Sequence, residues 1–316
     1  MTTRNTTHTA PKADIYTRIT ETILAQLEQG TRPWAKPWNA EHLAGRITRP
    51  LRANGTPYRG INVVMLWLAA TLKGYSAPIW MTYRQAAEIG GQVRKGEQGT
   101  AVAYADKLRR AETDETTGEA TLREIFFMKH YTVFNALQVD GLPAHFYATT
   151  APQISEHAKI AQAEAFFAAI AADVRHGGNR AFYAPQPDYV QMPPFETFRD
   201  AESYYATLGH ECIHWTRHPS RLDRDFGRKR WGDQGYAQEE LVAEIGAAFL
   251  AADLGLYLEP REDHAAYIAS WLEVLKKDKK AIFIAASHAQ KALDFLHARQ
   301  GEAAEQDEPE KMRAAA

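Results

Sequence analysis

The stretch His210-Glu211-Cys212-Ile213-His214 decides how this chain is interpreted, because it has the form HExxH. The residues before it predict a helix that begins after Asp200, a suitable N-cap. Residues four apart lie on the same face of a helix, so His210 and His214 can bind one metal ion. Glu211 lies beside that face, where it can accept a proton from a water molecule on the metal.

A catalytic metal site with two histidines needs a third protein ligand and one open position. The helix predicted over residues 236–252 supplies the candidates. We expect Glu244 to be the third ligand, because it lies mid-helix among small residues, where an unpaired carboxylate is costly to bury. We place Glu239 and Glu240 in a solvated first turn, from which Glu240 can orient a histidine ligand. The alternative is that Glu244 is a partly exposed carboxylate with no metal.

Composition is that of a globular protein of two domains. Of the 316 residues, 45% are hydrophobic and 24% are charged, and the one cysteine, Cys212, excludes an internal disulfide. No apolar run approaches the roughly 20 residues that span a bilayer, and residues 1–9 lack the apolar core of a signal peptide. We therefore expect a cytoplasmic location and no membrane partner.

The two halves of the chain carry opposite charge. Residues 1–110 contain 16 Lys and Arg against 7 Asp and Glu, whereas residues 151–316 contain 19 against 26. A basic half joined to an acidic half predicts a polyanionic partner for the first half alone.

Aromatic and glycine-rich segments lie within the basic half. Trp34 and Trp38 stand among prolines and cations, and each either seals the core or stacks on nucleic-acid bases. The core interpretation is favoured for Trp34, and both remain open for Trp38. Residues 90–99 form a glycine-rich loop whose backbone N–H groups, beside Arg94 and Lys95, suit phosphate contact.

The periodicity predicts an α+β first domain over residues 13–142 and a mainly helical second domain, with a small antiparallel sheet, over residues 153–298. Helices are expected at residues 14–29, 63–72, 84–89, 155–172, 236–252, 263–276 and 279–297, and strands at residues 100–104, 125–134, 180–184 and 188–192. Residues 109–124 are expected to form an exposed hairpin loop between the strands at residues 100–104 and 125–134, and residues 1–12 and 300–316 are expected to be disordered tails.

Six short motifs, in a fixed order, point to a known family. They are YRGIN (58–62), WMTYRQA (80–86), VRKGE (93–97), YTVFN (131–135), DYVQMPP (188–194) and YATLGHE (205–211), with Glu244 downstream. Together they resemble the ArdC-type antirestriction proteins of conjugative plasmids, in which a single-stranded-DNA-binding domain precedes a zincin-like metallopeptidase domain. Related N-terminal domains occur in plasmid-borne primases. The resemblance covers most of residues 13–295.

The resemblance implies a protein that binds the incoming single strand of plasmid DNA and counters host restriction. It implies one Zn²⁺ ion bound by His210, His214 and Glu244. Glu211 would then act as the general base in hydrolysis of a host protein or peptide.

In the first domain, six side chains are the expected DNA contacts. Phosphates would be contacted by Arg52, Arg59, Arg94 and Lys95, and bases would stack on Trp38 and Tyr58.

Two other functions compete with this one. The chain is alternatively a non-catalytic single-stranded-DNA-binding protein with a structural or vestigial metal site. A nuclease or primase is disfavoured, because the sequence shows no carboxylate cluster suited to two Mg²⁺ ions.

Overall fold

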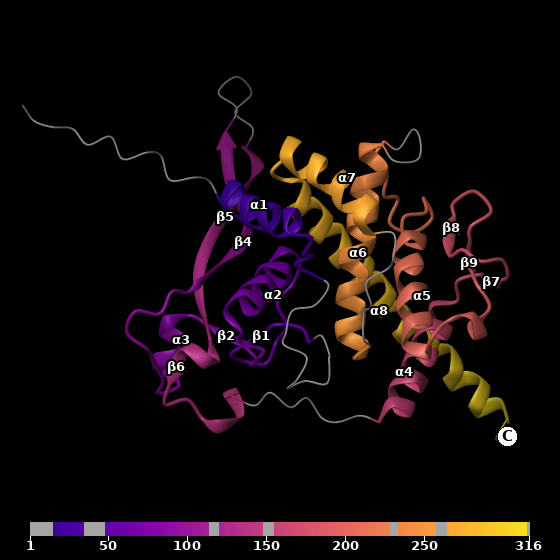
Figure 1. Cartoon of the computed structure of the whole chain (residues 1–316), viewed down its shortest axis with the longest axis horizontal. Coiled ribbons are helices and arrows are strands. Elements are labelled where there is room, and N and C mark those ends of the chain that lie inside the picture. Colours follow the sequence, from indigo (N-terminus) through magenta and orange to yellow (C-terminus); the bar gives the residue numbers. More distant parts are fainter. Residues whose placement is uncertain are drawn as a thin grey trace, which may run out of the picture.

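The computed structural model describes residues 15–34, 48–113, 120–147, 155–227, 233–256 and 264–314 (Figure 1). An N-terminal α+β part lies beside a helical C-terminal part, which has a small sheet at its far edge. This is the two-domain α+β architecture that the sequence predicts. Among the described residues, no helix is long and apolar enough to cross a membrane.

The N-terminal domain is built on a four-stranded sheet of order β1-β2-β5-β4. These strands are β1 (Leu51–Arg52), β2 (Ile79–Met81), β5 (Ala120–Asn135) and β4 (Thr100–Thr113). Helices α1 (Ile15–Glu28), α2 (Ile61–Lys73) and α3 (Tyr83–Glu88) accompany it, with a two-stranded ribbon of β3 (Gln92–Val93) and β6 (Val139–Asp140). Two 3₁₀ turns, η1 (Ala136–Gln138) and η2 (Ala144–Tyr147), flank β6.

Polar side chains within the family-like motifs fasten this domain together. The Asn62 amide bonds both the N–H and the carbonyl oxygen of Ala103, at 2.7 Å each, and so ties α2 to β4. Thr82 and Gln85 form a reciprocal capping box that begins α3. Asn135, which is fully buried, caps η1 and donates to the carbonyl of Ala77. These residues therefore have structural roles, independent of any DNA contact.

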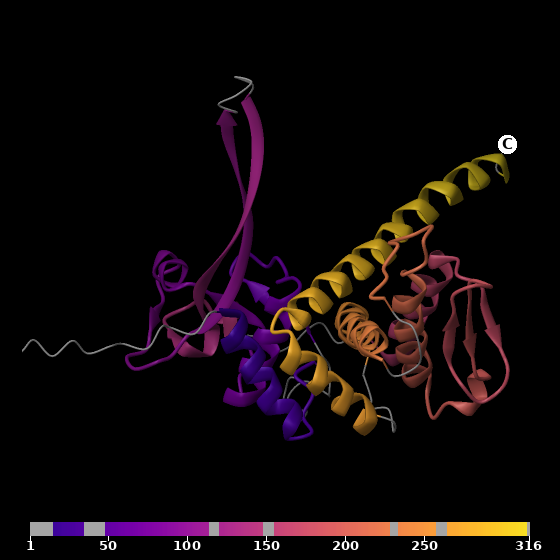
Figure 2. The same ribbon diagram turned by 90° about the horizontal axis from the view of Figure 1, so that it is seen from above.

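Strands β4 and β5 form one long antiparallel hairpin, paired from Thr100↔Val133 to Thr113↔Ala120. Figure 2 shows the hairpin projecting away from the body of the molecule. The predicted hairpin is present, but its strands are longer than expected: residues 109–113 and 120–124, which were assigned to the hairpin loop, belong to β4 and β5. Charge alternation in this segment obscures the strand pattern, since a hairpin that protrudes needs no apolar face.

The C-terminal domain begins with α4 (Glu156–Ile170) and a three-stranded sheet of order β7-β9-β8. The predicted pair is present as β8 (Phe182–Ala184) and β9 (Tyr189–Met192), but β7 (Val174–His176), which the sequence did not predict, pairs parallel with β9. After η3 (Phe195–Thr197) come α5 (Ala201–Trp215), α6 (Gln234–Leu254), α7 (His264–Lys277) and α8 (Ala281–Ala314).

Helix α8 begins beside the N-terminal domain, runs across the helical domain (Figure 2) and contacts α2, α4, α5, α6 and α7. It continues to Ala314, through most of the segment that was expected to be a disordered tail. Alanine and glutamate, which favour helix, dominate residues 302–305 and let the helix run on beyond the core.

The two domains share one apolar core. Trp67 of α2 makes an edge-to-face contact with Phe249 of α6, with ring centroids 5.8 Å apart. Trp34 contacts Trp271 of α7 in the same manner at 5.6 Å and is 1% exposed, which confirms the core interpretation of Trp34. The buried Arg49 adds a polar link, since its Nε donates to Asp253 Oδ1 at 2.9 Å.

Candidate metal centre

Helices α5 and α6 cross at the HExxH motif. Asp200 caps α5 as predicted, because its carboxylate accepts from the N–H of Ser203 at 2.7 Å. Gly246 of α6 lies directly against Ile213 of α5, where a Cβ atom would be 2.9 Å from the isoleucine side chain. The absence of a side chain at residue 246 therefore sets how closely the two helices approach.

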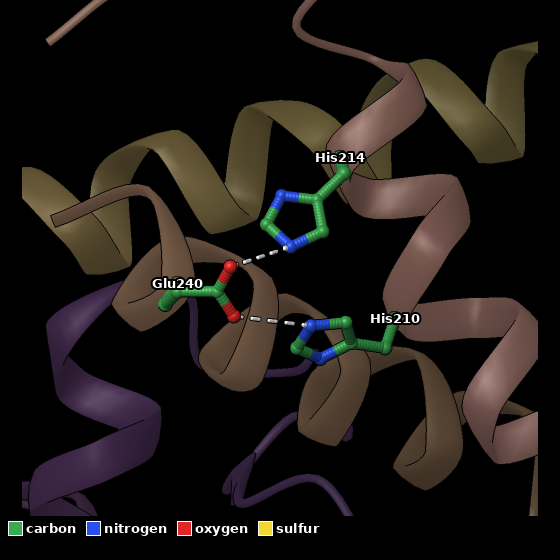
Figure 3. Close-up of side chains that lie close together, drawn as sticks. All are labelled: His210, His214 and Glu240. Atoms are coloured by element: carbon green, nitrogen blue, oxygen red, sulfur yellow. Dashed lines mark ion pairs between the residues drawn. The ribbon is translucent and has the colours of Figure 1, made fainter. Parts of the chain in front are cut away.

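Three side chains converge in this crossing: His210 and His214 from α5 and Glu240 from α6 (Figure 3). The Nε2 atoms of His210 and His214 lie 3.6 and 3.5 Å from the two carboxylate oxygens of Glu240. The three ligand atoms lie within 4.8 Å of one another, and all three residues are buried. Within the described residues, this is the group of His, Cys, Asp and Glu placed to share a metal ion.

The opposite ring nitrogens of the two histidines face two other carboxylates. His214 Nδ1 is 3.0 Å from Oε1 of Glu239, and His210 Nδ1 is 3.7 Å from Oε1 of Glu244. The Nδ1 atom of each imidazole therefore faces a carboxylate, within hydrogen-bond distance for His214, while both Nε2 atoms face the carboxylate of Glu240. A carboxylate behind a histidine ligand fixes the ring and makes its other nitrogen a stronger donor.

An arginine holds each of these carboxylates. Arg224 makes a two-pronged contact with Glu239, at 2.8 Å from Nε and 2.7 Å from Nη2, and is itself buried. Arg32 Nη1 lies 2.9 Å from Oε2 of Glu244. Neither arginine belongs to the HExxH motif or to the acidic stretch of α6, so spacing gives no signal for them.

Glu240 and Glu244 lie at different places from those expected of a histidine-orienting residue and a third ligand. Glu240, expected to orient a histidine, lies with both Nε2 atoms, while Glu244, expected as the third ligand, lies behind His210. The placement of Glu239 and Glu240 in a solvated first turn is wrong: α6 begins at Gln234, and the two residues are only 2% and 8% exposed. The sequence predicts that this helix begins at residue 236, two residues later than it does, and so places Glu239 and Glu240 closer to its first turn.

The charges in the centre are strongly coupled. Burial alone would lower the pKa of His214, but the carboxylates of Glu240 and Glu239 outweigh it and raise that pKa to about 10. Burial would raise the pKa of Glu239, but Arg224 and His214 lower it to about 2. A metal ion that binds here must displace a proton from His214, so metal binding and proton release are linked.

Three further side chains border the centre. Glu211, the predicted general base, is 3% exposed, and Cys212 behind it is fully enclosed, with burial raising the pKa of its thiol. Tyr236, which sequence reasoning missed, lies one turn before Glu240 with its hydroxyl 3.0 Å from that of Tyr267. Burial and the nearby Glu240 raise the pKa of Tyr236, so it is a neutral hydroxyl at physiological pH.

These residues fit a divalent metal ion. One ligand atom from each of the three residues lies within 4.8 Å of the other two, which is close enough for a single metal ion to bind all three. Two imidazoles and one carboxylate are a donor set that leaves a fourth position open, as catalytic zinc sites require. Manganese accepts the same nitrogen and oxygen donors.

The candidate DNA contacts of the N-terminal domain differ in how exposed they are. Tyr58 is 6% exposed and the Arg52 guanidinium lies 5.0 Å from its ring centroid, so the expected stacking role of Tyr58 is wrong. Arg52 remains exposed, whereas Arg59 forms an ion pair with Asp294 of α8. Trp38 lies outside the described residues.

Arg94 and Lys95 border an open hollow of about 560 Å³. Both cations are exposed, and Arg94 also contacts Glu97 at 2.8 Å and the carbonyl of Leu137 at 2.6 Å. Tyr83, also in the lining, is 53% exposed. Sequence reasoning placed Tyr83 in a motif but did not select it as a contact.

Two family models match the chain. Residues 13–134 match the N-terminal domain of the anti-restriction factor ArdC, and residues 161–288 match a zincin-like metallopeptidase domain. Protein y4eC of Sinorhizobium fredii is 45% identical over 96% of this chain and 97% of its own length. The DNA primase TraC of Escherichia coli is 39% identical over 90% of this chain, which spans 27% of the primase.

Solved structures of the antirestriction protein ArdC from plasmid R388 share the fold. The metal-free structure is 49% identical, with a TM-score of 0.77, and the match covers 92% of this chain and 98% of that one. The Mn(II)-bound structure is 47% identical, with a TM-score of 0.74, and covers 91% and 98%. The chain therefore belongs to the ArdC antirestriction family and joins an ArdC-type N-terminal domain to a zincin-like metallopeptidase domain.

Proposed function

We propose that this chain is an antirestriction protein that binds single-stranded DNA through its N-terminal domain and hydrolyses peptide bonds at a zinc centre. The observation that supports catalysis is the convergence of His210, His214 and Glu240, which are all buried, with a further carboxylate facing the Nδ1 atom of each histidine. A structural zinc site would use a fourth protein ligand, and the described cluster contains three.

In the proposed hydrolysis, different residues bind the metal ion and transfer the proton. His210, His214 and Glu240 would hold the metal ion, which when bound supplies Lewis-acid activation of water and of the peptide carbonyl. Glu211, in the same helical turn, takes the proton from the attacking water and returns it to the leaving amine. The substrate is a host protein or peptide that meets the DNA-bound protein in the cytoplasm.

Glu211→Gln tests this function directly. The zinc-loaded variant is compared with the wild-type chain for cleavage of casein and of a protein crosslinked to single-stranded DNA. Because Glu211 is not a ligand in this arrangement, bound zinc should remain stoichiometric while cleavage falls by at least about 100-fold. Equal cleavage by both proteins would refute the assigned role. If antirestriction in cells survives Glu211→Gln, DNA occupancy alone protects the plasmid.

DNA binding is proposed for the hollow beside β3. Lys95 and Arg94 offer cations for phosphates, and the exposed ring of Tyr83 offers a face for stacking on a base. Two further exposed aromatic rings, those of Tyr104 and Tyr131, contact each other at the base of the hairpin and are 46% and 47% exposed.

Fluorescence anisotropy with a labelled single strand measures both contributions. Lys95→Ala should reduce the slope of log affinity against log salt by about 1, and Tyr83→Leu should cost about 1–3 kcal/mol at every salt concentration. Lys277→Ala, at an exposed position of α7, is the matched control and should leave the slope unchanged. An affinity independent of salt would contradict phosphate-dominated binding.

A further inference from the structure

The N-terminal part of the chain reaches the metal centre through a single carboxylate. Arg32, four residues beyond the end of α1, contacts Oε2 of Glu244 with its Nη1 at 2.9 Å. Oε1 of the same carboxylate faces His210 Nδ1 at 3.7 Å. The Arg32 and Glu244 side chains are 9% and 11% exposed, so this link lies inside the protein.

The position of Arg32 is fixed by the chain on either side of it. Gly30 ends α1 in the left-handed conformation, at φ +74°, and turns the chain toward the helical domain. Two residues after Arg32, the fully buried Trp34 contacts Trp271 of α7. The arginine is thus held between a helix end and a buried anchor, which limits where its guanidinium can lie.

The two histidines are supported in the same way, but from different domains. Behind His214, the carboxylate of Glu239 is held by Arg224 from the C-terminal domain. Behind His210, the carboxylate of Glu244 is held by Arg32 from the N-terminal segment. The helical domain therefore supplies one carboxylate–arginine pair complete, whereas the other pair needs residue 32.

We propose that Arg32 is a positioning residue of the metal centre: it holds Glu244 behind His210 so that His210 Nε2 faces Glu240. This inference rests on the proposed metal-binding function. A carboxylate buried without its cation would turn toward the metal or toward solvent, and His210 would lose the group that fixes its ring. The metal site is therefore complete only when the N-terminal segment is docked.

Titration of the full chain with Co²⁺ tests the proposal, because the visible absorption of bound Co²⁺ reports ligand geometry. Arg32→Ala should weaken Co²⁺ binding by about 10- to 100-fold and alter the absorption bands. Arg32→Lys should recover part of the affinity, because it restores the charge without the planar fork.

Arg49→Ala is the matched control. Arg49 also joins the domains and is buried, but it contacts Asp253, nine residues beyond Glu244 on α6. This variant should bind Co²⁺ within about twofold of the wild type, since no orienting carboxylate is released. Thermal unfolding in the presence of EDTA checks that both alanine variants are folded before metal is added.

Two results would overturn the proposal. Wild-type affinity and absorption in Arg32→Ala would show that Glu244 needs no arginine, and an equal loss in Arg49→Ala would assign the effect to domain docking in general. A wild-type chain that binds no Co²⁺ would remove both this inference and the proposed catalysis. Arg32-dependent binding in a chain that cleaves no peptide would uphold the inference and refute the peptidase.

Discussion

At the scale of the residue, the metal centre depends on which ring nitrogen of each histidine faces which carboxylate. Glu240 meets the two Nε2 atoms, while Glu239 and Glu244 lie behind the rings. These three carboxylates and two imidazoles share a buried space and must all be partnered, since an isolated charge there would be costly. The arrangement therefore behaves as one unit, in which each acid has a separate role.

Substitution of Glu240 and of Glu244 should have unequal effects on metal binding. Glu240→Gln removes an anionic ligand and should weaken Zn²⁺ affinity by more than about 100-fold, whereas Glu244→Gln loses an orienting contact and should cost about 10-fold. Competition with a chromogenic chelator measures both. Glu202→Gln, in the first turn of α5, is the control and should bind normally. A larger loss of Zn²⁺ affinity in Glu244→Gln than in Glu240→Gln would identify Glu244 as the ligand instead.

At the scale of the element, the α5–α6 contact is set by the missing side chain of Gly246. A Cβ atom there would meet three atoms of Ile213 at 2.9–3.0 Å, and Ile213 lies between the two histidine ligands. Any separation of the helices would therefore be transmitted to the metal site. The small sheet is joined to the same end of α5 through Asp188 and Arg221, because Arg221 also contacts Trp215, the last residue of α5.

Gly246→Ala should lower the free energy of unfolding by about 1–3 kcal/mol, because the added methyl overpacks the crossing. Adding Ile213→Val, which removes one methyl group from the contact, should recover part of the loss. Gly301→Ala is the control, since a Cβ on that exposed glycine of α8 meets nothing within 4 Å, and it should stabilise by about 0.5–1 kcal/mol. Urea denaturation measures all three. A neutral Gly246→Ala would show that the helices adjust freely.

The Asp188–Arg221 pair should make the small sheet sensitive to acid. Arg221 Nη1 lies 3.0 Å from Asp188 and also contacts the ring of Trp215, where α5 ends. The hydrogen bond from Arg221 lowers the pKa of Asp188. A carboxylate with a lowered pKa in the folded state stabilises at neutral pH, and this contribution disappears as the pH falls below the unfolded value of about 3.9 and through the folded one.

Asp188→Asn should therefore lower the free energy of unfolding by about 1 kcal/mol at pH 7. As the pH falls and Asp188 becomes protonated in the wild type, the difference between the two proteins should disappear. Urea denaturation between pH 7 and pH 3 measures this difference. Asp173→Asn, whose carboxylate pairs with Arg175 on an exposed edge, is the control and should change stability little at any pH. A deficit that persists unchanged at low pH would contradict the assigned ion pair.

At the scale of the whole molecule, the two domains are joined by one core. Aromatic contacts between Trp67 and Phe249 and between Trp34 and Trp271 cross the boundary, and α8 contacts helices of both halves. Domains that share buried surface of this kind unfold together, because neither retains its core without the other.

Thermal unfolding of the metal-free chain should therefore be one cooperative transition. Near-ultraviolet circular dichroism, which reports the shared tryptophans, and far-ultraviolet circular dichroism, which reports the helices, should give the same midpoint. Bound Zn²⁺ should raise both midpoints equally, since metal binding to the native state stabilises the whole cooperative unit. Two separated transitions, with only one shifted by metal, would show that the domains are independent.

Local periodicity was enough for much of this protein. The helix after Asp200, the alignment of His210 and His214 on one face, and the α+β and helical halves follow from spacing, capping and charge. These features depend on residues a few positions apart, whose relations are fixed by helix and strand geometry. The core interpretation that was favoured for Trp34 was also correct.

Only the tertiary structure decided the features that depend on distant residues. Glu240 and Glu244 lie one turn apart on the same helix, so which one meets the histidines depends on how α6 is rotated against α5 at Gly246. Arg32 lies 212 positions from Glu244, and no local pattern connects them. The sequence by itself determined the donors of a metal site, and the packing of the two domains determined the role of each.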